Sequence, residues 1–285
     1  TVIPYFVKFT KKFPNLHTLS KCSEKEILKL WEGLGYYRRA RNLLATTKIL
    51  VNEKNSKLPN KIKEIKSLPG VGDYTANALL GFVHNQPTIA LDGNVKRMFS
   101  RLLDKKENLI DYDKLIKKNE KIIFKNRRNS DLVEAMIEFG ALVCKPKLPN
   151  CLNCDIKKFC KSYTQKKKFK IKNKKNIIEK KYDIFCYLNK KKNQIALSQD
   201  NKLGFLKKFK LPQVKKRSTK KISKSWKLLC NYDNYISNKK LKINLYYKFS
   251  KKIPKNFSWH SLENKKEFVP TFTRKIFKHI SNLYK

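Results

Sequence analysis

The chain has 285 residues, enough for one large domain or two ordinary ones, and hydrophobic residues make up 40% of it, enough for a core. Its 68 Lys and Arg residues against 22 Asp and Glu residues give a formal net charge of +46, which indicates a polyanionic partner, most simply nucleic acid. Solvated lysines without a partner are the alternative. No apolar run reaches about 18 residues, so we expect no membrane-spanning helix.

Seven cysteines are present, and four of them fall between residues 144 and 160. The other three, Cys22, Cys186 and Cys230, are scattered. This distribution does not suit the disulfide framework of a small secreted protein. It indicates a metal site in a protein of a reducing compartment, the cytoplasm.

The first 50 residues predict three helices. The opening stretch reads as the end of a helix with Val2, Phe6 and Phe9 on one face. Ser23 and Glu26 predict a capping box that starts the second helix, which ends in the turn at residues 33–35. The third helix has apolar residues at helical spacing and begins with three arginines: Arg38, Arg39 and Arg41. Arginines in a first turn oppose the helix dipole, which suits a nearby phosphate or a merely solvated surface equally well.

Residues 60–84 predict a helix-hairpin-helix. Residues 60–67 form a short helix that Pro69 ends, and Gly70, Val71 and Gly72 make a tight turn. Asp73 is placed to cap the second helix, whose inward side we expect to carry Ala76, Leu79, Leu80 and Val83. The glycines let backbone N–H groups approach a DNA phosphate, and the second helix directs its positive end at that anion. The alternative is an ordinary corner between two helices.

Asp92 follows this hairpin by 20 residues and precedes a stretch with helical spacing from Val95 to Leu103. The geometry predicts an N-cap, which has a purely structural interpretation. A carboxylate fixed as an anion by helix-terminal N–H groups also suits the stabilisation of a cationic sugar while a glycosidic bond breaks. The position so soon after the hairpin favours the second interpretation.

Residues 110–143 predict two more helices, and the second leads into Cys144, Cys151, Cys154 and Cys160, spaced C-x6-C-x2-C-x5-C. Four thiolates within 17 residues suit a [4Fe–4S] cluster or a structural zinc ion, and the spacing does not choose between them. Five lysines thread this loop, so we expect it to present positive charge to phosphate: Lys145, Lys147, Lys157, Lys158 and Lys161.

The Lys- and Asn-rich residues 164–181 predict a linker. From Tyr182 the period of the apolar residues changes to two, and a second alternating stretch runs from Leu241 to Phe249, so both predict strands. A final helix is expected from Thr271 to Tyr284. The region 182–285 is therefore predicted to be a small α+β domain.

Together these motifs resemble the MutY family of adenine DNA glycosylases, within the helix-hairpin-helix DNA glycosylases. The resemblance rests on LWEGLGYYRRARNL at 30–43, LPGVGDYTANA at 68–78, LDGNVKR at 91–97, the four clustered cysteines, and a degenerate match at 203–213. It implies a multidomain fold: an all-α helix-hairpin-helix glycosylase domain at 1–163 with an iron–sulfur loop at 144–160, a basic linker at 164–181, and a smaller Nudix-like α+β domain at 182–285.

The resemblance implies a monomer that removes adenine mispaired with 8-oxoguanine or guanine from duplex DNA, after flipping the adenine out of the helix. Asp92 matches the catalytic aspartate, Tyr74 an assisting tyrosine, and Asn94 a neighbouring site residue. The four cysteines match ligands of a [4Fe–4S] cluster. DNA contacts are implied at the two turns and beyond them: Leu34, Tyr36, Gly70, Val71, Gly72, Lys96 and Ser237. Ser237 is the retained residue of the element that reads 8-oxoguanine.

Two other functions stay open. An endonuclease III-like glycosylase/lyase would carry a lysine where this chain has Tyr74, and a phenol cannot form a Schiff base. The second of these other functions is that of a non-catalytic iron–sulfur DNA-binding protein. The family's general-acid glutamate lies before the segment that matches the start of this chain, and Glu24, Glu26 and Glu32 are poor substitutes. We therefore expect the sequence to be an N-terminally truncated fragment that binds DNA but excises adenine poorly.

Overall fold

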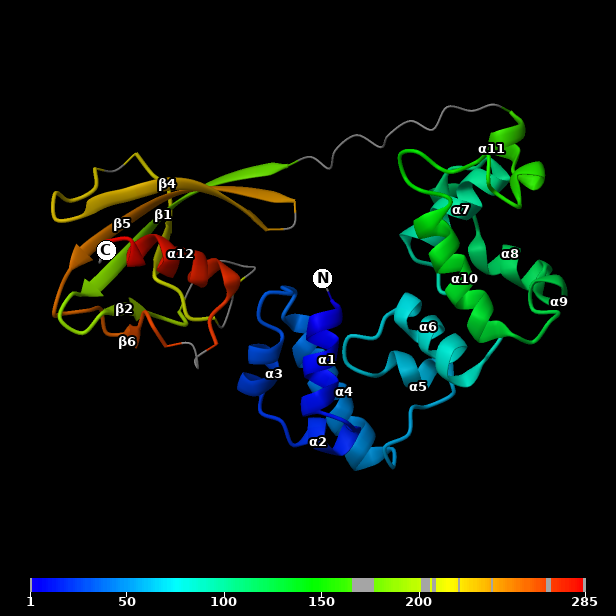
Figure 1. The fold of residues 1–285 in the computed structure, drawn as a ribbon, viewed down its shortest axis with the longest axis horizontal. Helices are drawn as coiled ribbons and strands as arrows, with labels where there is room; N and C mark the ends of the chain where they lie inside the picture. The colour runs from blue at the N-terminus through cyan, green and yellow to red at the C-terminus, as the bar shows by residue number, and fades with distance from the viewer. Residues whose placement is uncertain are drawn as a thin grey trace. The chain divides into compact units, whose positions relative to one another are not determined.

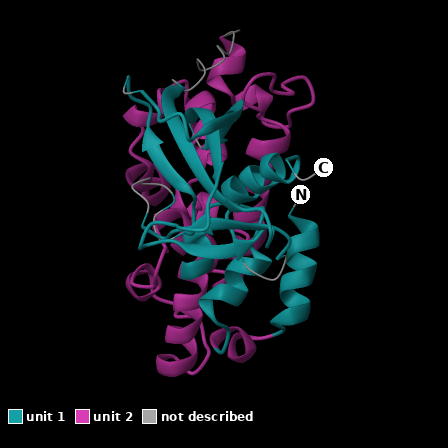
Figure 2. Ribbon diagram, turned by 90° about the vertical axis from the view of Figure 1, so that its left-hand side faces the viewer, with its two compact units in different colours: residues 1–14, 21–41, 174–285 teal, residues 15–20, 42–173 magenta. Residues whose placement is uncertain are grey.

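The computed structural model describes residues 2–165, 177–200, 206, 209–219, 221–236, 238–264 and 268–283. The chain divides into two compact units (Figure 2). The first contains residues 1–14, 21–41 and 174–285, and the second contains residues 15–20 and 42–173. Among the described residues, none of the helices combines the length and the apolar character that crossing a membrane requires. The domain boundaries expected at residues 163 and 182 stay a prediction.

The residues before the sheet are helical (Figure 1). Eleven α-helices and two short 3₁₀ helices are described there: α1 Ile3–Lys12, α2 Leu16–Ser20, α3 Glu24–Leu30, α4 Arg38–Glu53, α5 Ile62–Lys66, α6 Asp73–His84, α7 Gly93–Leu103, η1 Glu107–Leu109, α8 Tyr112–Lys118, α9 Glu120–Ile123, α10 Asn129–Leu142, η2 Lys157–Phe159 and α11 Lys161–Thr164. The region 110–143 thus forms α8, α9 and α10 where the sequence predicted two helices.

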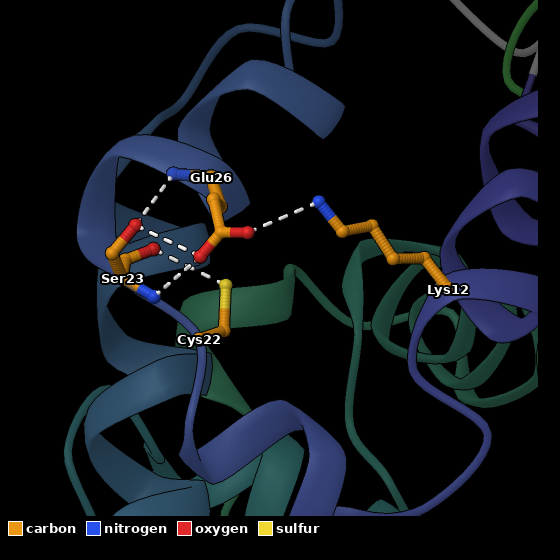
Figure 3. Close-up of polar contacts among 4 residues, drawn as sticks. All are labelled: Lys12, Cys22, Ser23 and Glu26. Carbon is orange, nitrogen blue, oxygen red and sulfur yellow. Dashed lines mark hydrogen bonds and ion pairs between the residues drawn. The ribbon is translucent and has the colours of Figure 1, made fainter.

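The predicted capping box opens α3 (Figure 3). The backbone N–H of Glu26 donates to Ser23 Oγ at 3.2 Å, and the backbone N–H of Ser23 donates to Glu26 Oε2 at 3.0 Å. Lys12 Nζ of α1 adds an ion pair with Glu26 Oε1 at 3.3 Å. Two otherwise unpaired N–H groups are thereby satisfied at the start of a helix only seven residues long.

The helix α1 has no buried residue, and Val2 and Phe6 are mostly exposed. Phe9, on the same helix, makes edge-to-face contacts with Phe13 and Trp31. The apolar face expected from the sequence is therefore only partly covered within the described residues.

In the second unit, α6 and α7 each pack on α10. Val95, Met98 and Phe99 of α7 form its main core with Ile89 and Phe124. The inward side of α6 differs from the sequence prediction, because Val83 is exposed while Gly81 is buried. A Cβ atom at Gly81 would lie 2.7 Å from Val133 Cγ2 of α10, so the close approach of the two helices turns the glycine face inward.

Beyond the helices, six strands form one mixed sheet in the order β4-β5-β1-β2-β6, with β3 paired to β1. The strands are β1 Ile178–Asn189, β2 Gln194–Leu197, β3 Gln213–Lys216, β4 Lys227–Ile236, β5 Lys239–Phe249 and β6 Ser258–Ser261. The pair β1–β5 is parallel and the other pairs are antiparallel. The first strand begins at Ile178, four residues before the predicted change of period. Its first four residues, 178–181, are mostly exposed and pair with β5.

The helix α12 (Thr271–Ser281) packs on β4 (Figure 1). Its apolar residues Phe272, Ile276, Phe277 and Ile280 are buried. The ring of His279 stacks on Tyr232 of β4 at 4.6 Å, and Lys275 Nζ donates to Asn234 Oδ1 at 2.8 Å. The alternating residues of β1 and β5 that the sequence predicted as one face, such as Ile184 and Leu245, are buried.

Candidate nucleic-acid interface and catalytic site

The hairpin between α5 and α6 has the backbone that the L-P-G-V-G string predicts. Gly70 has φ +79°, and a Cβ atom there would lie 2.1 Å from Asn42 Nδ2, so only glycine fits the turn. Gly72 has an ordinary φ of −98°, is exposed, and has open space where a Cβ would point. Val71 between them is partly buried against the small core of Ile65 and Leu80. The turn is therefore closely packed at Gly70 and free of neighbouring atoms at Gly72.

The N-terminus of α6 carries no side-chain cap. The N-cap residue is Gly72, and Asp73 is the first helical residue, so the prediction that Asp73 caps the helix is wrong. The Asp73 carboxylate instead pairs with Lys66 Nζ of α5 at 2.5 Å, and this hydrogen bond and charge lower the pKa of Asp73. The first-turn N–H groups of α6 thus lack a side-chain acceptor from the cap residue, which suits an incoming anion.

Asp92 is the N-cap of α7, as predicted. Its Oδ1 accepts from the backbone N–H of Asn94 at 2.8 Å and of Val95 at 2.7 Å, and its Oδ2 accepts from Asn94 Nδ2 at 2.9 Å. These three hydrogen bonds lock the orientation of a half-buried carboxylate. The arrangement presents a fixed negative charge at the mouth of a helix.

Arg97 connects this carboxylate to the cysteine loop. Its Nη2 donates to Asn94 Oδ1 at 2.9 Å and to the carbonyl of Gly140 at 2.5 Å, and its Nε donates to the carbonyl of Cys144 at 3.0 Å. Gly140 is required here, because a Cβ atom would lie 2.7 Å from Asn94 Cβ and 2.8 Å from the Asn94 carbonyl. Asp92, Asn94, Arg97 and Cys144 therefore form one continuous hydrogen-bonded chain.

The four cysteines line one pocket. Arg101 reaches it from α7 and donates through Nη1 to Cys144 Sγ at 3.4 Å and to the Lys145 carbonyl at 2.7 Å. Burial raises the pKa of Cys151, and the neighbouring cysteines raise it further while Arg101 lowers it. Across the described residues, no three His, Cys, Asp or Glu side chains meet as ligands of a single metal ion.

Arg97 and Arg101 were not assigned a role from the sequence, although the signal was present. Residues four apart lie on the same side of a helix. Two arginines at that spacing just after Asp92 indicate a side of α7 that faces backbone carbonyls or another polar surface. The partner, which is the cysteine loop more than 40 residues away, could not be read from the spacing.

The remaining predicted residues are placed as follows. Tyr74 lies in the first turn of α6, with 43% of its surface exposed. Lys96 directs its Nζ to the ring of Tyr112 at 5.8 Å. Leu34 and Tyr36 belong to the first compact unit; Tyr36 has φ +48° and is 71% exposed, with the Arg39 guanidinium over its ring at 5.2 Å. Ser237 lies outside the described residues.

The three glutamates near the start of the chain are engaged in structural contacts. Glu24 pairs with Arg41 at 2.6 Å, and Glu26 belongs to the capping box of α3. Glu32 pairs with Lys29 at 2.8 Å and with Arg274 of α12, and its carboxylate is largely buried. The expectation that none of the three acts as the general acid stays a prediction.

Comparison with known proteins identifies the family. Residues 1–125 match the HhH-GPD superfamily of base excision DNA repair proteins. The adenine DNA glycosylase of Buchnera aphidicola subsp. Baizongia pistaciae is 44% identical over 217 residues, which are 75% of this chain and 62% of that protein. The adenine DNA glycosylase of Buchnera aphidicola subsp. Schizaphis graminum is 33% identical over 263 residues, which are 88% of this chain and 70% of that protein.

A solved structure shows the same helical fold. The structure of a thermostable thymine-DNA glycosylase is 26% identical, with a TM-score of 0.50, and the match covers 57% of this chain and 76% of that one. The match to this chain spans 62% of the Baizongia pistaciae adenine DNA glycosylase and 70% of the Schizaphis graminum one. On these similarities, this chain belongs to the adenine DNA glycosylase family, within the HhH-GPD superfamily.

Proposed function

We propose that the protein is a monofunctional base-excision-repair glycosylase that hydrolyses the N-glycosidic bond of adenine mispaired with 8-oxoguanine or guanine in duplex DNA. The observation that carries this proposal is Asp92, held by three hydrogen bonds at the N-terminus of α7 and 20 residues after the hairpin turn. The names of the related proteins supply the base, adenine. The opposing base follows from the family resemblance.

The chemistry needs a negative charge that does not move. Loss of adenine leaves a sugar with oxocarbenium character, and a preorganised carboxylate stabilises that cation. Asn94 keeps Asp92 oriented, since its backbone and side chain both donate to the carboxylate. Tyr74 offers a phenol rather than an amine, so water is the nucleophile that completes hydrolysis.

The hairpin would make the contacts with the DNA backbone. Its outer side exposes Gly70 and Gly72 and the uncapped first turn of α6, so backbone N–H groups can approach a phosphate. The net charge of +46 adds a salt-dependent attraction to the whole duplex. Binding in this way carries no sequence information, which suits an enzyme that must survey any DNA.

The cysteine pocket fits the [4Fe–4S] cluster that the family resemblance implies. The cluster would be held by Cys144, Cys151, Cys154 and Cys160, which line the pocket together. When bound, such a cluster would staple the loop that follows α10, and Arg97 and Arg101 hold the backbone of that loop.

The experiment compares two helix-capping aspartates. Asp111 caps α8 and accepts from the backbone N–H of Lys114 at 3.0 Å, so Asp111→Asn is a matched control for Asp92→Asn. Adenine release from an A:8-oxoguanine duplex should fall by about 10²–10³-fold in Asp92→Asn only. A duplex with a cationic pyrrolidine sugar in place of deoxyadenosine should also lose affinity only for Asp92→Asn. Equal behaviour of both variants would refute the proposal, and borohydride trapping of a DNA adduct at the rate of base loss would favour a lyase.

A further inference from the structure

One face of the sheet carries the apolar residues that pack with α12, and the opposite face is different in kind. Ladder partners lie on the same face, so Phe185 of β1 and Tyr246 of β5 project together, away from buried Ile184 and Leu245. Tyr187 shares this opposite face. From residue 177 onward, α12 is the only helix among the described residues, and its contacts with β4 include Tyr232 and Asn234 on the other face.

Four aromatic rings form a continuous cluster on this face: Phe185, Tyr187, Trp226 and Tyr246. The rings of Phe185 and Tyr246 are stacked at 5.3 Å with an angle of 16° between their planes. Trp226, which precedes β4, meets Phe185 and Tyr187 edge to face, each at 4.9 Å. All except Phe185 keep part of their surface open to solvent.

Two lysines sit on these rings. Lys248 Nζ lies 4.8 Å from the centre of the Tyr187 ring and 4.6 Å from that of Trp226. Lys215 Nζ lies 5.4 Å from the centre of the Phe185 ring. We name these six residues the aromatic–lysine face.

The carboxylates of the same face are already paired with other cations. Asp183 pairs with Arg217 at 3.1 Å, and Asp233 pairs with Lys240 at 2.8 Å. Glu179 pairs with Lys242 at 3.1 Å. The carboxylates of this face are paired with other cations, so Lys215 and Lys248 leave it with a positive charge. That charge favours an anionic partner.

We propose that the aromatic–lysine face binds unpaired nucleotides of single-stranded DNA. Aromatic rings on an open sheet provide stacking surfaces for bases, and interleaved lysines bind the phosphates between them. Duplex DNA cannot use such a surface, because its bases are already stacked in pairs. This function goes beyond adenine excision and uses neither the hairpin nor Asp92.

The test measures binding of a labelled oligothymidylate of about 12 nucleotides to the full chain at about 0.15 M salt, beside a duplex of the same length. Tyr187→Leu and Trp226→Leu remove a ring but keep an apolar side chain, and each should weaken single-strand binding about tenfold. Lys248→Gln should weaken it as well, and Lys248→Arg should restore it, because arginine keeps the charge and also lies over aromatic rings. Duplex binding should change less than twofold.

The face of the sheet that packs with α12 supplies the matched controls. Phe249 is exposed, is the ladder partner of buried Leu188, and has Lys190 Nζ at 5.9 Å from its ring. Phe249→Leu and Lys190→Gln therefore remove the same chemistry elsewhere and should leave single-strand binding unchanged. Equal losses in these controls, or equal losses in single-strand and duplex binding, would overturn the proposal.

A second measurement needs no variant. Oligodeoxynucleotides that carry 5-bromodeoxyuridine should photo-crosslink to peptides that contain Tyr187 or Trp226, as mapped by mass spectrometry. Crosslinks confined to the cysteine loop or to the helical hairpin would also overturn the proposal. Because none of these probes reads adenine release, their outcome is separate from that of the Asp92→Asn experiment.

Discussion

The guanidinium of Arg97 donates to the side-chain oxygen of Asn94 at 2.9 Å, while the amide nitrogen of Asn94 donates to Asp92 at 2.9 Å. The arginine thereby decides which way the Asn94 amide points. The same guanidinium donates to carbonyls of Gly140 and Cys144, so the orientation of Asp92 depends on the position of the cysteine loop.

Arg97→Gln should therefore damage both stability and the orientation of Asp92. Several charge-assisted hydrogen bonds are lost, so we expect the free energy of unfolding to fall by about 2 kcal/mol and adenine release to slow by about tenfold or more. The control is Arg128→Gln, because Arg128 forms an exposed ion pair with Asp131 worth less than about 1 kcal/mol. Thermal melts and single-turnover assays measure the two effects, and a melt of Arg97→Gln equal to that of the control would contradict the role.

Gly140→Ala tests the close approach of α10 and α7. The added Cβ would lie 2.7 Å from Asn94 Cβ, so α7 must shift, and we expect a loss of about 1–3 kcal/mol in unfolding free energy. Gly93→Ala is the comparison, because no atom lies within 4 Å of the Cβ it would add. Urea denaturation separates the two, and equal midpoints would show that the contact is not rigid.

Substitution of the two glycines of the hairpin should affect different properties, stability for Gly70 and DNA affinity for Gly72. Gly70→Ala combines a positive φ with a clash against Asn42, so we expect a loss of stability of about 2–4 kcal/mol. Gly72→Ala has an ordinary φ and open space, so its stability should be unchanged. If the backbone at Gly72 approaches a phosphate, this second variant should still bind duplex DNA more weakly. Unchanged affinity would remove Gly72 from the interface.

The capping box of α3 predicts a dependence of stability on pH. Hydrogen bonds from Ser23, with a further contribution from Lys12, lower the pKa of Glu26 from 4.5 to about 2 in the folded chain. The stabilisation is complete above pH 4.5 and is lost as pH falls through about 2. Glu26→Gln should flatten the dependence of melting temperature on pH in this window. Lys12→Gln should keep most of it, because the bonds from Ser23 remain.

Removal of single thiols tests the cluster. Cys151→Ala should lose the broad visible absorbance and the four irons per chain expected of a [4Fe–4S] protein. Cys230→Ala, outside the pocket, should keep both. Zinc in place of iron in the unaltered chain would contradict the cluster and leave a structural metal site.

The sequence by itself determined the local features. Ser23 and Glu26 predicted a capping box, the L-P-G-V-G string predicted the hairpin, and Asp92 was placed correctly as an N-cap, because these arrangements depend on residues within four positions of one another. Alternation in β1 and β5 predicted buried strands for the same reason.

Only the tertiary structure decided how distant segments meet. Val83 was predicted to be inside and is exposed, because Gly81 allows α10 to approach α6 on a different side. Asp73 was predicted as a cap and instead pairs with Lys66. The bond from Arg97 to the Cys144 carbonyl, and the aromatic rings gathered from β1, β5 and the segment before β4, join residues with no periodic relation in the chain. Such contacts are set by packing, which selects partners by shape and satisfied hydrogen bonds rather than by spacing.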